Sequence, residues 1–251
     1  MINNNSDILD NKILKGLSLN WDKIEKHSYL RKIPAISKLK ELKFKSSISF
    51  FVGENGSGKS TLLEAIAIAY GFNPEGGTIN FNFSNYDDTS ELHNAIRLQK
   101  GINRNKFGYF LRAESFFNLA TKSEEYAQSG GGGMIPPSNL HFRSHGESFL
   151  DYIQTYNKAG LYIMDEPEAA LSPQRQLVLI YEIVKMAQSG AQFIIATHSP
   201  VLLGIPESDI ISFDDGKLHR CSWEETGCYQ VTKAFLNNRD KMLKELLSEE
   251  N

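Results

Sequence analysis

The sequence feature that most constrains the fold is a glycine-rich loop between two apolar runs. Residues 53–61 match the pattern G-x-x-x-x-G-K-[ST], which is typical of phosphate-binding loops. The β-prone run 47–52 precedes the loop and the Ala- and Leu-rich run 61–69 follows it, so the context predicts strand, loop and helix. Backbone N–H groups of such a loop, with a helix N-terminus behind them, bind phosphate oxygens. The loop therefore predicts a nucleoside triphosphate site made of these residues: Gly53, Glu54, Asn55, Gly56, Ser57, Gly58, Lys59, Ser60 and Thr61.

Length and composition are those of an ordinary globular chain. We expect 251 residues to form a single α/β domain over 1–251, and the net charge of −3 gives no global signature of nucleic-acid binding. The two cysteines, Cys221 and Cys228, are too few for a disulfide framework. No apolar stretch approaches the roughly 20 residues needed to span a bilayer, so we expect a cytoplasmic protein without direct membrane insertion.

Alternating strands and helices in the second half predict a mainly parallel sheet. Residues 161–164 are apolar throughout, as in a strand buried on both faces, and 192–196 is expected to be another buried strand. Residues 174–189 have helical spacing of their apolar residues. Asp-Gly at 215–216 predicts a hairpin between 210–213 and 217–220. The last segment, 229–249, is predicted to be an amphipathic helix.

The first half is less regular. Strands flanking the phosphate-loop strand are plausible within 1–45, and 78–83 and 107–111 are strand candidates. Helices are expected at 88–100, 116–126 and 147–157, and the Gly-rich stretch 129–137 is expected to be a surface connector.

Two acidic residues follow the apolar run 161–164. A carboxylate at the C-terminal end of a parallel strand near the phosphate loop is suited to hold Mg²⁺, so Asp165 is the metal candidate and Ser60 the second ligand. Glu166 is then placed to polarise a water for attack on the γ-phosphate. His198 ends the next apolar strand at the same edge of the sheet, and a γ-phosphate contact is favoured over a structural role.

These motifs in order resemble the ABC-type ATPase superfamily of P-loop NTPases. The set consists of the phosphate loop, Asp165-Glu166-Pro167, Leu171-Ser172-Pro173 and Thr197-His198-Ser199, and the resemblance covers roughly 29–215. Within the superfamily the chain looks like the small ATPases that are soluble rather than transporter subunits. The resemblance implies a mainly parallel sheet flanked by helices, an antiparallel β portion, a small helical subdomain inserted at about 85–160, and ATP and Mg²⁺ as ligands.

The resemblance also implies a signature motif upstream of Asp165. Ser144-His145-Gly146-Glu147-Ser148 keeps the Ser and Gly of the family pattern L-S-G-G-Q but has Arg143 for Leu, His145 for the first Gly and Glu147 for Gln. Ser144, Gly146 and Glu147 would then contact the γ-phosphate bound by a second copy, although Ser144 and Glu147 also fit a helix capping box. Glu114 occupies the place of the family's metal- or water-linking Gln; an exposed ion pair is the alternative there.

The family mechanism implies a head-to-tail homodimer that sandwiches two ATP molecules. Lys59, Glu166 and His198 are the expected catalytic side chains, and the ATP cycle would drive a switch for an effector protein, with DNA repair or phage defence as settings and DNA contact left open. Two other readings remain, a nucleotide-binding subunit of a membrane transporter and a non-catalytic, ATP-dependent scaffold. The altered signature and Glu114 disfavour the transporter subunit, and the complete set of Asp165, Glu166 and His198 disfavours the scaffold.

Overall fold

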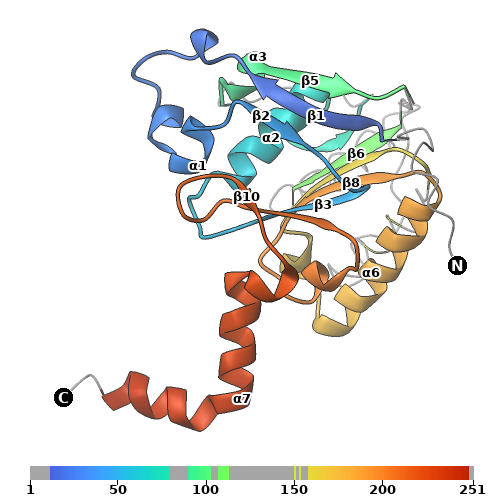
Figure 1. Ribbon diagram of the computed structural model, residues 1–251. Coiled ribbons are helices and arrows are strands. Elements are labelled where there is room, and N and C mark those ends of the chain that lie inside the picture. The colour runs from blue at the N-terminus through green and yellow to red at the C-terminus, as the bar shows by residue number, and fades with distance from the viewer. Residues whose placement is uncertain are drawn as a thin grey trace, which may run out of the picture.

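The computed structural model describes residues 12–79, 90–102, 107–112, 150, 153 and 158–248. Within these ranges the chain forms two sheets with helices packed between and around them (Figure 1). The strands are β1 (Leu14–Leu19), β2 (Glu41–Lys43), β3 (Ile48–Val52), β4 (Gly77–Thr78), β5 (Ile96–Lys100), β6 (Gly108–Arg112), β7 (Leu161–Asp165), β8 (Gln192–Ala196), β9 (Asp209–Ser212) and β10 (His219–Arg220). The α-helices are α1 (Pro34–Ser37), α2 (Lys59–Tyr70), α3 (Leu92–Ala95), α6 (Pro173–Gln188) and α7 (Gly227–Ser248). The short 3-10 helices are η1 (Trp21–Lys23), η2 (Tyr29–Lys32), η4 (Pro167–Ala170), η5 (Leu202–Gly204) and η6 (Trp223–Glu225).

The larger sheet is mostly parallel. Among the described residues its strand order is β10-β9-β3-β8-β7-β6-β4, with parallel pairing from β9 through β6 and antiparallel pairing only at the two ends. The phosphate-loop strand β3 therefore lies between β8 and β9, and β7 lies one strand further along. The C-terminal ends of β3, β7 and β8 meet at the same edge, which confirms the predicted mixed α/β fold with a mainly parallel sheet.

Each face of this sheet has its own hydrophobic core. Along β3, Phe51 packs in the core that contains α2 and the smaller sheet, while Phe50 packs in the core that contains α6. The same alternation holds in β7, where Ile163 and Tyr162 point to opposite cores. Because both faces are covered, β3 and β7 direct apolar side chains to both sides of the sheet, and the apolar run 161–164 is the pattern that indicated a strand buried on both faces.

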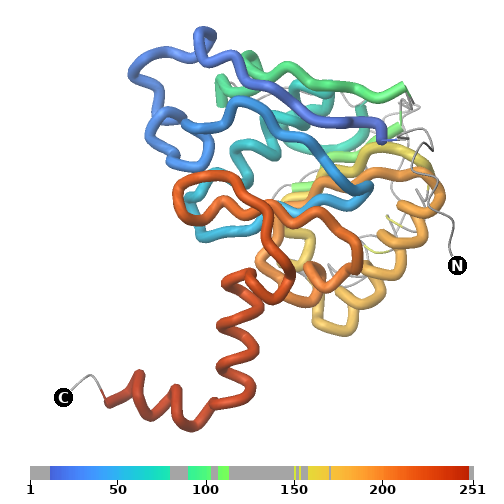
Figure 2. Tube along the Cα trace, viewed as in Figure 1, coloured from blue at the N-terminus to red at the C-terminus, as the bar shows by residue number. Residues whose placement is uncertain are grey.

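The smaller sheet is the antiparallel portion, with the order β2-β1-β5. It lies across α2 from the larger sheet, at the top of Figures 1 and 2. Strands had been expected within 1–45 beside β3, but β1 and β2 belong to this separate sheet instead. Gln192, at the start of β8, links the sheets by bonding both the N–H and the C=O of Leu14, each at 2.8 Å.

The prediction of one helix over 88–100 is wrong. A short helix is present, but α3 spans only Leu92–Ala95, with Glu91 as its N-cap residue and the Ser90 hydroxyl accepting a hydrogen bond from the Leu92 N–H. Residues 96–99 alternate apolar and polar side chains, and 96–100 pair with β1 along their whole length. The antiparallel partner supplies backbone hydrogen bonds that the sequence pattern alone did not reveal.

The proposed insertion at 85–160 falls mostly outside the described residues, as do the predicted helices 116–126 and most of 147–157. Leu150 and Ile153 are described, and both are helical and buried in the core beside α6. The hairpin predicted around Asp215-Gly216 is present as β9 and β10.

The predicted C-terminal helix is present as α7, which leaves the body of the molecule (Figure 1). It bends at Asn238, whose φ and ψ are −135° and 32°, and none of its residues is buried. No helix within the described ranges is both long and apolar enough to cross a membrane.

Candidate nucleotide-binding site

The phosphate loop has the backbone that its glycines predict. Gly53, Gly56 and Gly58 all have positive φ, at 141°, 78° and 101°. A Cβ at Gly58 would lie 2.7 Å from Cδ1 of Ile36 in α1, so the loop also packs too closely there for any side chain. The crest of the loop, residues 54–56, is exposed. The loop is thus fixed at its base against α1 and open toward solvent.

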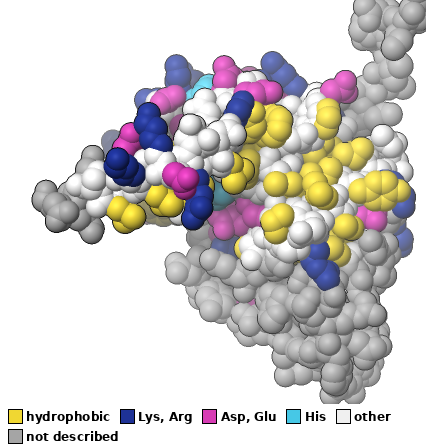
Figure 3. Space-filling view, turned by 90° about the horizontal axis from the view of Figure 1, so that it is seen from below, with side chains coloured by type: hydrophobic (Ala, Val, Ile, Leu, Met, Phe, Trp, Pro, Cys, Tyr) yellow, Lys and Arg dark blue, Asp and Glu magenta, His cyan; other side chains and the backbone are white. Residues whose placement is uncertain are grey.

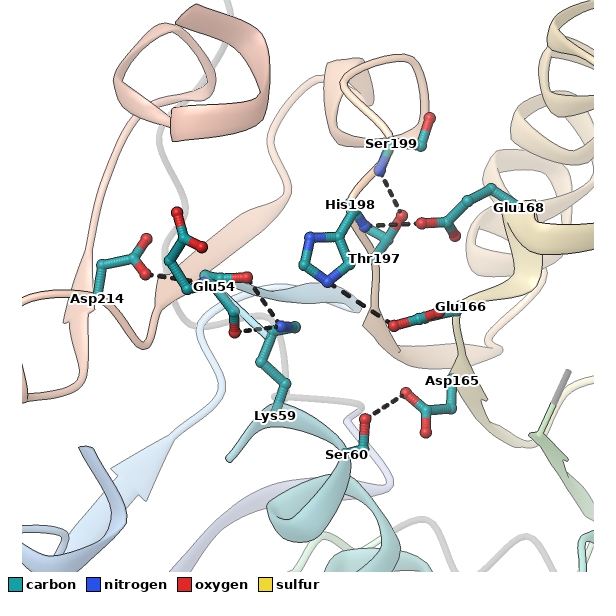
Figure 4. A network of polar contacts seen from close by, with 11 residues as sticks. Glu54, Lys59, Ser60, Asp165, Glu166, Glu168, Thr197, His198, Ser199 and Asp214 are labelled. Carbon is teal, nitrogen blue, oxygen red and sulfur yellow. Dashed lines mark hydrogen bonds and ion pairs between the residues drawn. The ribbon is translucent and has the colours of Figure 1, made fainter. Parts of the chain in front are cut away.

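Lys59 begins α2 and turns back under the loop. Its Nζ donates to the carbonyl oxygens of Gly53 and Glu54, at 2.8 and 2.9 Å (Figure 4). Burial lowers the pKa of Lys59, while the carboxylates of Glu166 and Asp165 act in the opposite direction. The ammonium is therefore held inside the loop, in reach of a phosphate that the loop would cradle.

Ser60 and Asp165 are brought together as predicted. The Ser60 hydroxyl, from α2, donates to Asp165 Oδ1 at the end of β7, at 3.0 Å. Burial raises the pKa of Asp165 from its ordinary value of 3.8 to about 6, against the opposing effects of the Ser60 hydrogen bond and the Arg112 charge. Two adjacent oxygen atoms of this kind suit Mg²⁺, which keeps most of its waters and takes one or two protein ligands.

Glu166 and His198 face each other across the edge of the sheet (Figure 4). Glu166 follows β7 with a left-handed backbone, φ 48° and ψ 53°, and its N–H donates to Ala196 O at the end of β8. His198 Nε2 lies 3.7 Å from Glu166 Oε1, which is too long for a hydrogen bond. A left-handed glutamate is costly, and such strain is typical of functional sites.

Two side chains that the sequence analysis did not single out also support the site. Asp214, interpreted only as part of a hairpin turn, accepts a hydrogen bond from the Glu54 N–H at 3.0 Å, across 160 residues. Arg112 pairs in register with Asp165 on the neighbouring strand and donates to Glu64 Oε2 of α2, at 2.8 Å. No sequence pattern marked either residue, because each contact depends on how distant strands pair.

A pocket of about 440 Å³ opens beside the loop. Its lining includes Glu54, Glu166, His198 and Asp214, together with Thr226 and residues 227, 228 and 231 at the start of α7. The start of α7 therefore belongs to the surroundings of the site, although the rest of the helix points away.

The described residues fit a triphosphate and Mg²⁺. Ser57 Oγ and His198 Nε2 are buried polar atoms without a hydrogen-bond partner among the described residues, and both belong to the proposed site. Lys59, Ser60 and Asp165 add a cation and a pair of oxygen ligands. No cluster of three or more His, Cys, Asp or Glu suited to a metal occurs in the described ranges. Ser60 with one carboxylate is sufficient for a metal that keeps its waters.

The structure thus brings Lys59, Ser60, Asp165, Glu166 and His198 together at one edge of the sheet. Four further residues of the predicted site lie outside the described ranges: Glu114, Ser144, Gly146 and Glu147.

Two family descriptions match consecutive parts of the chain. One, "AAA domain", matches residues 28–149, and the other, "AAA domain, putative AbiEii toxin, Type IV TA system", matches residues 148–204. The first match contains the phosphate loop, and the second contains Asp165, Glu166 and His198.

Among curated proteins, the chain is 23% identical over 224 residues to a "Putative ribose/galactose/methyl galactoside import ATP-binding protein 1" of Rhizobium etli. The alignment covers 77% of this chain but 42% of that protein, so the chain spans less than half of the relative's length.

Among solved structures, cbiO1 from Clostridium perfringens, described as part of the ABC transporter complex cbiONQ, is 16% identical with a TM-score of 0.45. It covers 83% of this chain and 91% of its own. The SMC head domain from Thermotoga maritima is 13% identical with a TM-score of 0.41, and covers 83% and 98%.

The matched families and the arrangement of the site agree. A phosphate loop after one strand, an Asp-Glu pair after a second and a His after a third all meet at one edge of a mainly parallel sheet. The chain is similar to P-loop ATPases of the AAA/ABC type, both in these matches and in the arrangement of its site.

Proposed function

We propose that this site binds Mg-ATP and hydrolyses it to ADP and phosphate. The observation that carries the proposal is that Lys59, the Ser60–Asp165 pair and the Glu166–His198 pair converge on the loop from three separate segments of the chain. A site that only bound phosphate would not require a carboxylate and an imidazole facing each other beside it.

Each side chain has a distinct task in this reaction. The loop N–H groups and Lys59 hold the β- and γ-phosphates, with Lys59 exchanging its two loop carbonyls for phosphate oxygens. Ser60 and Asp165 would hold Mg²⁺, which would supply positive charge where negative charge develops. Glu166 orients the attacking water and accepts its proton, and His198 contacts the γ-phosphate. Catalysis then consists of positioning and electrostatic stabilisation.

We propose further that two copies close head to tail over two ATP molecules. The exposed crest of the phosphate loop and the open pocket beside it support this arrangement, since a single chain leaves that side of the site in solvent. Ser144, Gly146 and Glu147 of the second copy would cover the γ-phosphate, and Glu114 would link the metal or the water to the rest of its own chain. The single-domain organisation over 1–251, with an insertion at about 85–160, belongs to the same proposal.

The closure of the dimer is proposed to act as a switch for an effector protein in the cytoplasm, in DNA repair or phage defence. A transporter subunit is the second candidate, favoured by the name of the curated relative. Copurified partners separate the two, because a transporter subunit retains a membrane permease and a switch retains a soluble effector. Stimulation of hydrolysis by DNA would indicate the repair setting.

The variant Glu166→Gln tests both the chemistry and the dimer. It keeps the shape of the side chain but removes the proton acceptor, so we expect phosphate release to fall by at least about 100-fold. ATP-bound dimers should accumulate, because closure no longer leads to hydrolysis. Phosphate release and light-scattering mass with Mg-ATP are the measurements.

The matched control is Glu245→Gln, an exposed glutamate on α7, which should leave both measurements at the wild-type level. A Glu166→Gln protein that hydrolyses ATP normally and stays monomeric would disprove the shared-site proposal. Dimers that form with ATP in a wild-type protein that releases no phosphate would identify the scaffold instead.

A further inference from the structure

The turn that carries His198 is tied to the segment that follows Glu166. The His198 N–H donates to Glu168 Oε1 at 2.7 Å, and the Ser199 hydroxyl donates to Gln176 Oε1 at 2.6 Å. Glu168 lies in η4 and Gln176 in the first turns of α6, so both supports come from the chain just beyond the Asp165-Glu166 pair (Figure 4 shows the Glu168 contact).

The hydrogen bond from the His198 N–H to Glu168 is a strong one. A carboxylate that accepts from a backbone N–H at this distance makes a charge-assisted hydrogen bond, roughly twice as strong as a neutral one. The other oxygen, Oε2, is buried and has no hydrogen-bond partner among the described residues. The glutamate thus directs one oxygen at His198, while its second oxygen gains no hydrogen bond within the described chain.

Gln176 links the turn after His198 to a second turn, the one that precedes α6. Its Nε2 donates to Leu171 O at 3.2 Å, just before Ser172 caps α6. Ser199 Oγ in turn accepts from the N–H groups of Val201 and Leu202, each at 3.2 Å. A continuous series of hydrogen bonds therefore runs from the Leu171–Ser172 turn to the backbone that follows His198.

We propose that Glu168 is a positioning residue that sets the place of His198 relative to Glu166, with Gln176 as its second support. Glu168 follows Glu166 by two residues. The same short segment therefore places the Glu166 carboxylate and, through the His198 backbone, the imidazole that faces it. The expected effect on kcat rests on the proposed ATP hydrolysis. The placement of His198 by Glu168 does not. Glu168 acts through His198 and touches no residue of the phosphate loop in the described contacts.

Kinetics of Glu168→Ala and Glu168→Gln provide the first test. Glu168→Ala removes the acceptor, and we expect kcat to fall by about 10- to 100-fold, since small misplacements of a site group have effects of this size. The dissociation constant of ATP should stay within about threefold of wild type, because Lys59 and the loop are untouched. Glu168→Gln keeps an acceptor oxygen and should restore kcat to within about fivefold.

A double-mutant cycle with His198→Ala separates positioning from an independent role. If Glu168 acts through His198, adding Glu168→Ala to His198→Ala should reduce kcat no further. Additive effects, or a wild-type kcat in either single variant, would overturn the proposal. Gln176→Ala should show the same dependence on His198, and the matched control Gln174→Ala, exposed on the same helix, should leave kcat unchanged.

The backbone amide of His198 gives a readout that needs no turnover. In the nucleotide-free protein, its proton resonance should lie downfield and move upfield in Glu168→Ala, with a smaller movement in Glu168→Gln. An unchanged resonance would refute the geometric part even in a protein that proves inactive. If the wild-type protein hydrolyses no ATP while the resonance behaves as expected, the proposed function is rejected. The positioning contact between Glu168 and His198 would still hold.

Discussion

At the scale of single residues, the site holds side chains in states that are unfavourable for folding. Burial raises the pKa of Asp165 to about 6, and Glu166 adopts a left-handed backbone. Both features disfavour the folded state without ligand, because an anion loses hydration and a non-glycine residue is strained. A bound cation would relieve the first of these costs.

Replacing Asp165 with Asn should stabilise the metal-free protein at pH 8. The pKa of Asp165 is higher in the folded chain, about 6, than its ordinary 3.8, so the folded state binds more protons between these values and stability falls as pH rises through that window. Above it the ionised carboxylate costs of the order of 1–3 kcal/mol, which Asn removes. We expect the Tm of Asp165→Asn in EDTA to exceed that of wild type at pH 8, with the difference shrinking at pH 5.

Asp240→Asn is the control, since Asp240 is exposed on α7 and should change Tm little at either pH. A lower Tm for Asp165→Asn at pH 8 would show that the Ser60 hydrogen bond outweighs the burial of the charge.

At the scale of elements, a buried amide links the two sheets by hydrogen bonds, in addition to the core that they share with α2. Gln192 is 1% exposed and bonds both backbone groups of Leu14. Among the described residues it thus takes the place of a partner strand on the edge of β1 that β2 does not reach at Leu14. Buried backbone groups that lose their partners carry a desolvation cost.

Gln192→Met should therefore lower the free energy of unfolding by about 2–4 kcal/mol, since the substitution keeps the volume but leaves two buried groups of Leu14 unpaired. Chemical denaturation measures the change. Gln230→Met, at an exposed hydrogen bond on α7, should stay within about 0.5 kcal/mol of wild type. Equal effects of the two substitutions would mean that water satisfies Leu14 when the amide is lost.

At the scale of the whole molecule, the body has a buried core, whereas α7 has no buried residue. Seen from below, hydrophobic side chains gather over α6, and further ones lie along the projecting helix (Figure 3). The exposed apolar residues of α6 are Leu177, Val178 and Tyr181, and those of α7 are Val231, Leu236, Leu246 and Leu247. Among the described residues, the start of α7 is anchored through Trp223 in η6, whose indole N–H donates to Pro200 O at 2.9 Å.

Removing residues 239–251 should leave thermal stability nearly unchanged. No residue of α7 is buried, so residues 239–248 contribute no core packing, and we expect Tm to stay within about 2 °C. A truncation from residue 222 should lower Tm clearly, because it also removes Trp223 and the buried Thr226. A large loss from the shorter truncation would show that α7 packs against something in solution, with a second copy as the first candidate to examine by light scattering.

Much of the fold and part of the site could be predicted because their signals are local. Glycine spacing predicted the loop from 53 to 58, and short, largely apolar runs predicted β3, β7 and β8 with the helices that follow β3 and β7. Acidic residues after such a strand predicted that Asp165 would meet Ser60, because parallel strand ends share an edge. The helix predicted over 88–100 failed because β1, more than 70 residues earlier in the chain, provides the partner that makes 96–100 a strand.

The sequence by itself determined the phosphate loop, the buried strands and the resemblance to P-loop ATPases, since these depend on spacing within a few residues and on backbone chemistry. Only the tertiary structure decided which strands are neighbours, that Asp214 holds the Glu54 N–H, and that Glu168 holds His198. The physical reason is that these contacts join segments 30 to 160 residues apart. Which distant polar groups meet depends on the pairing and packing of the whole sheet, which no local pattern encodes.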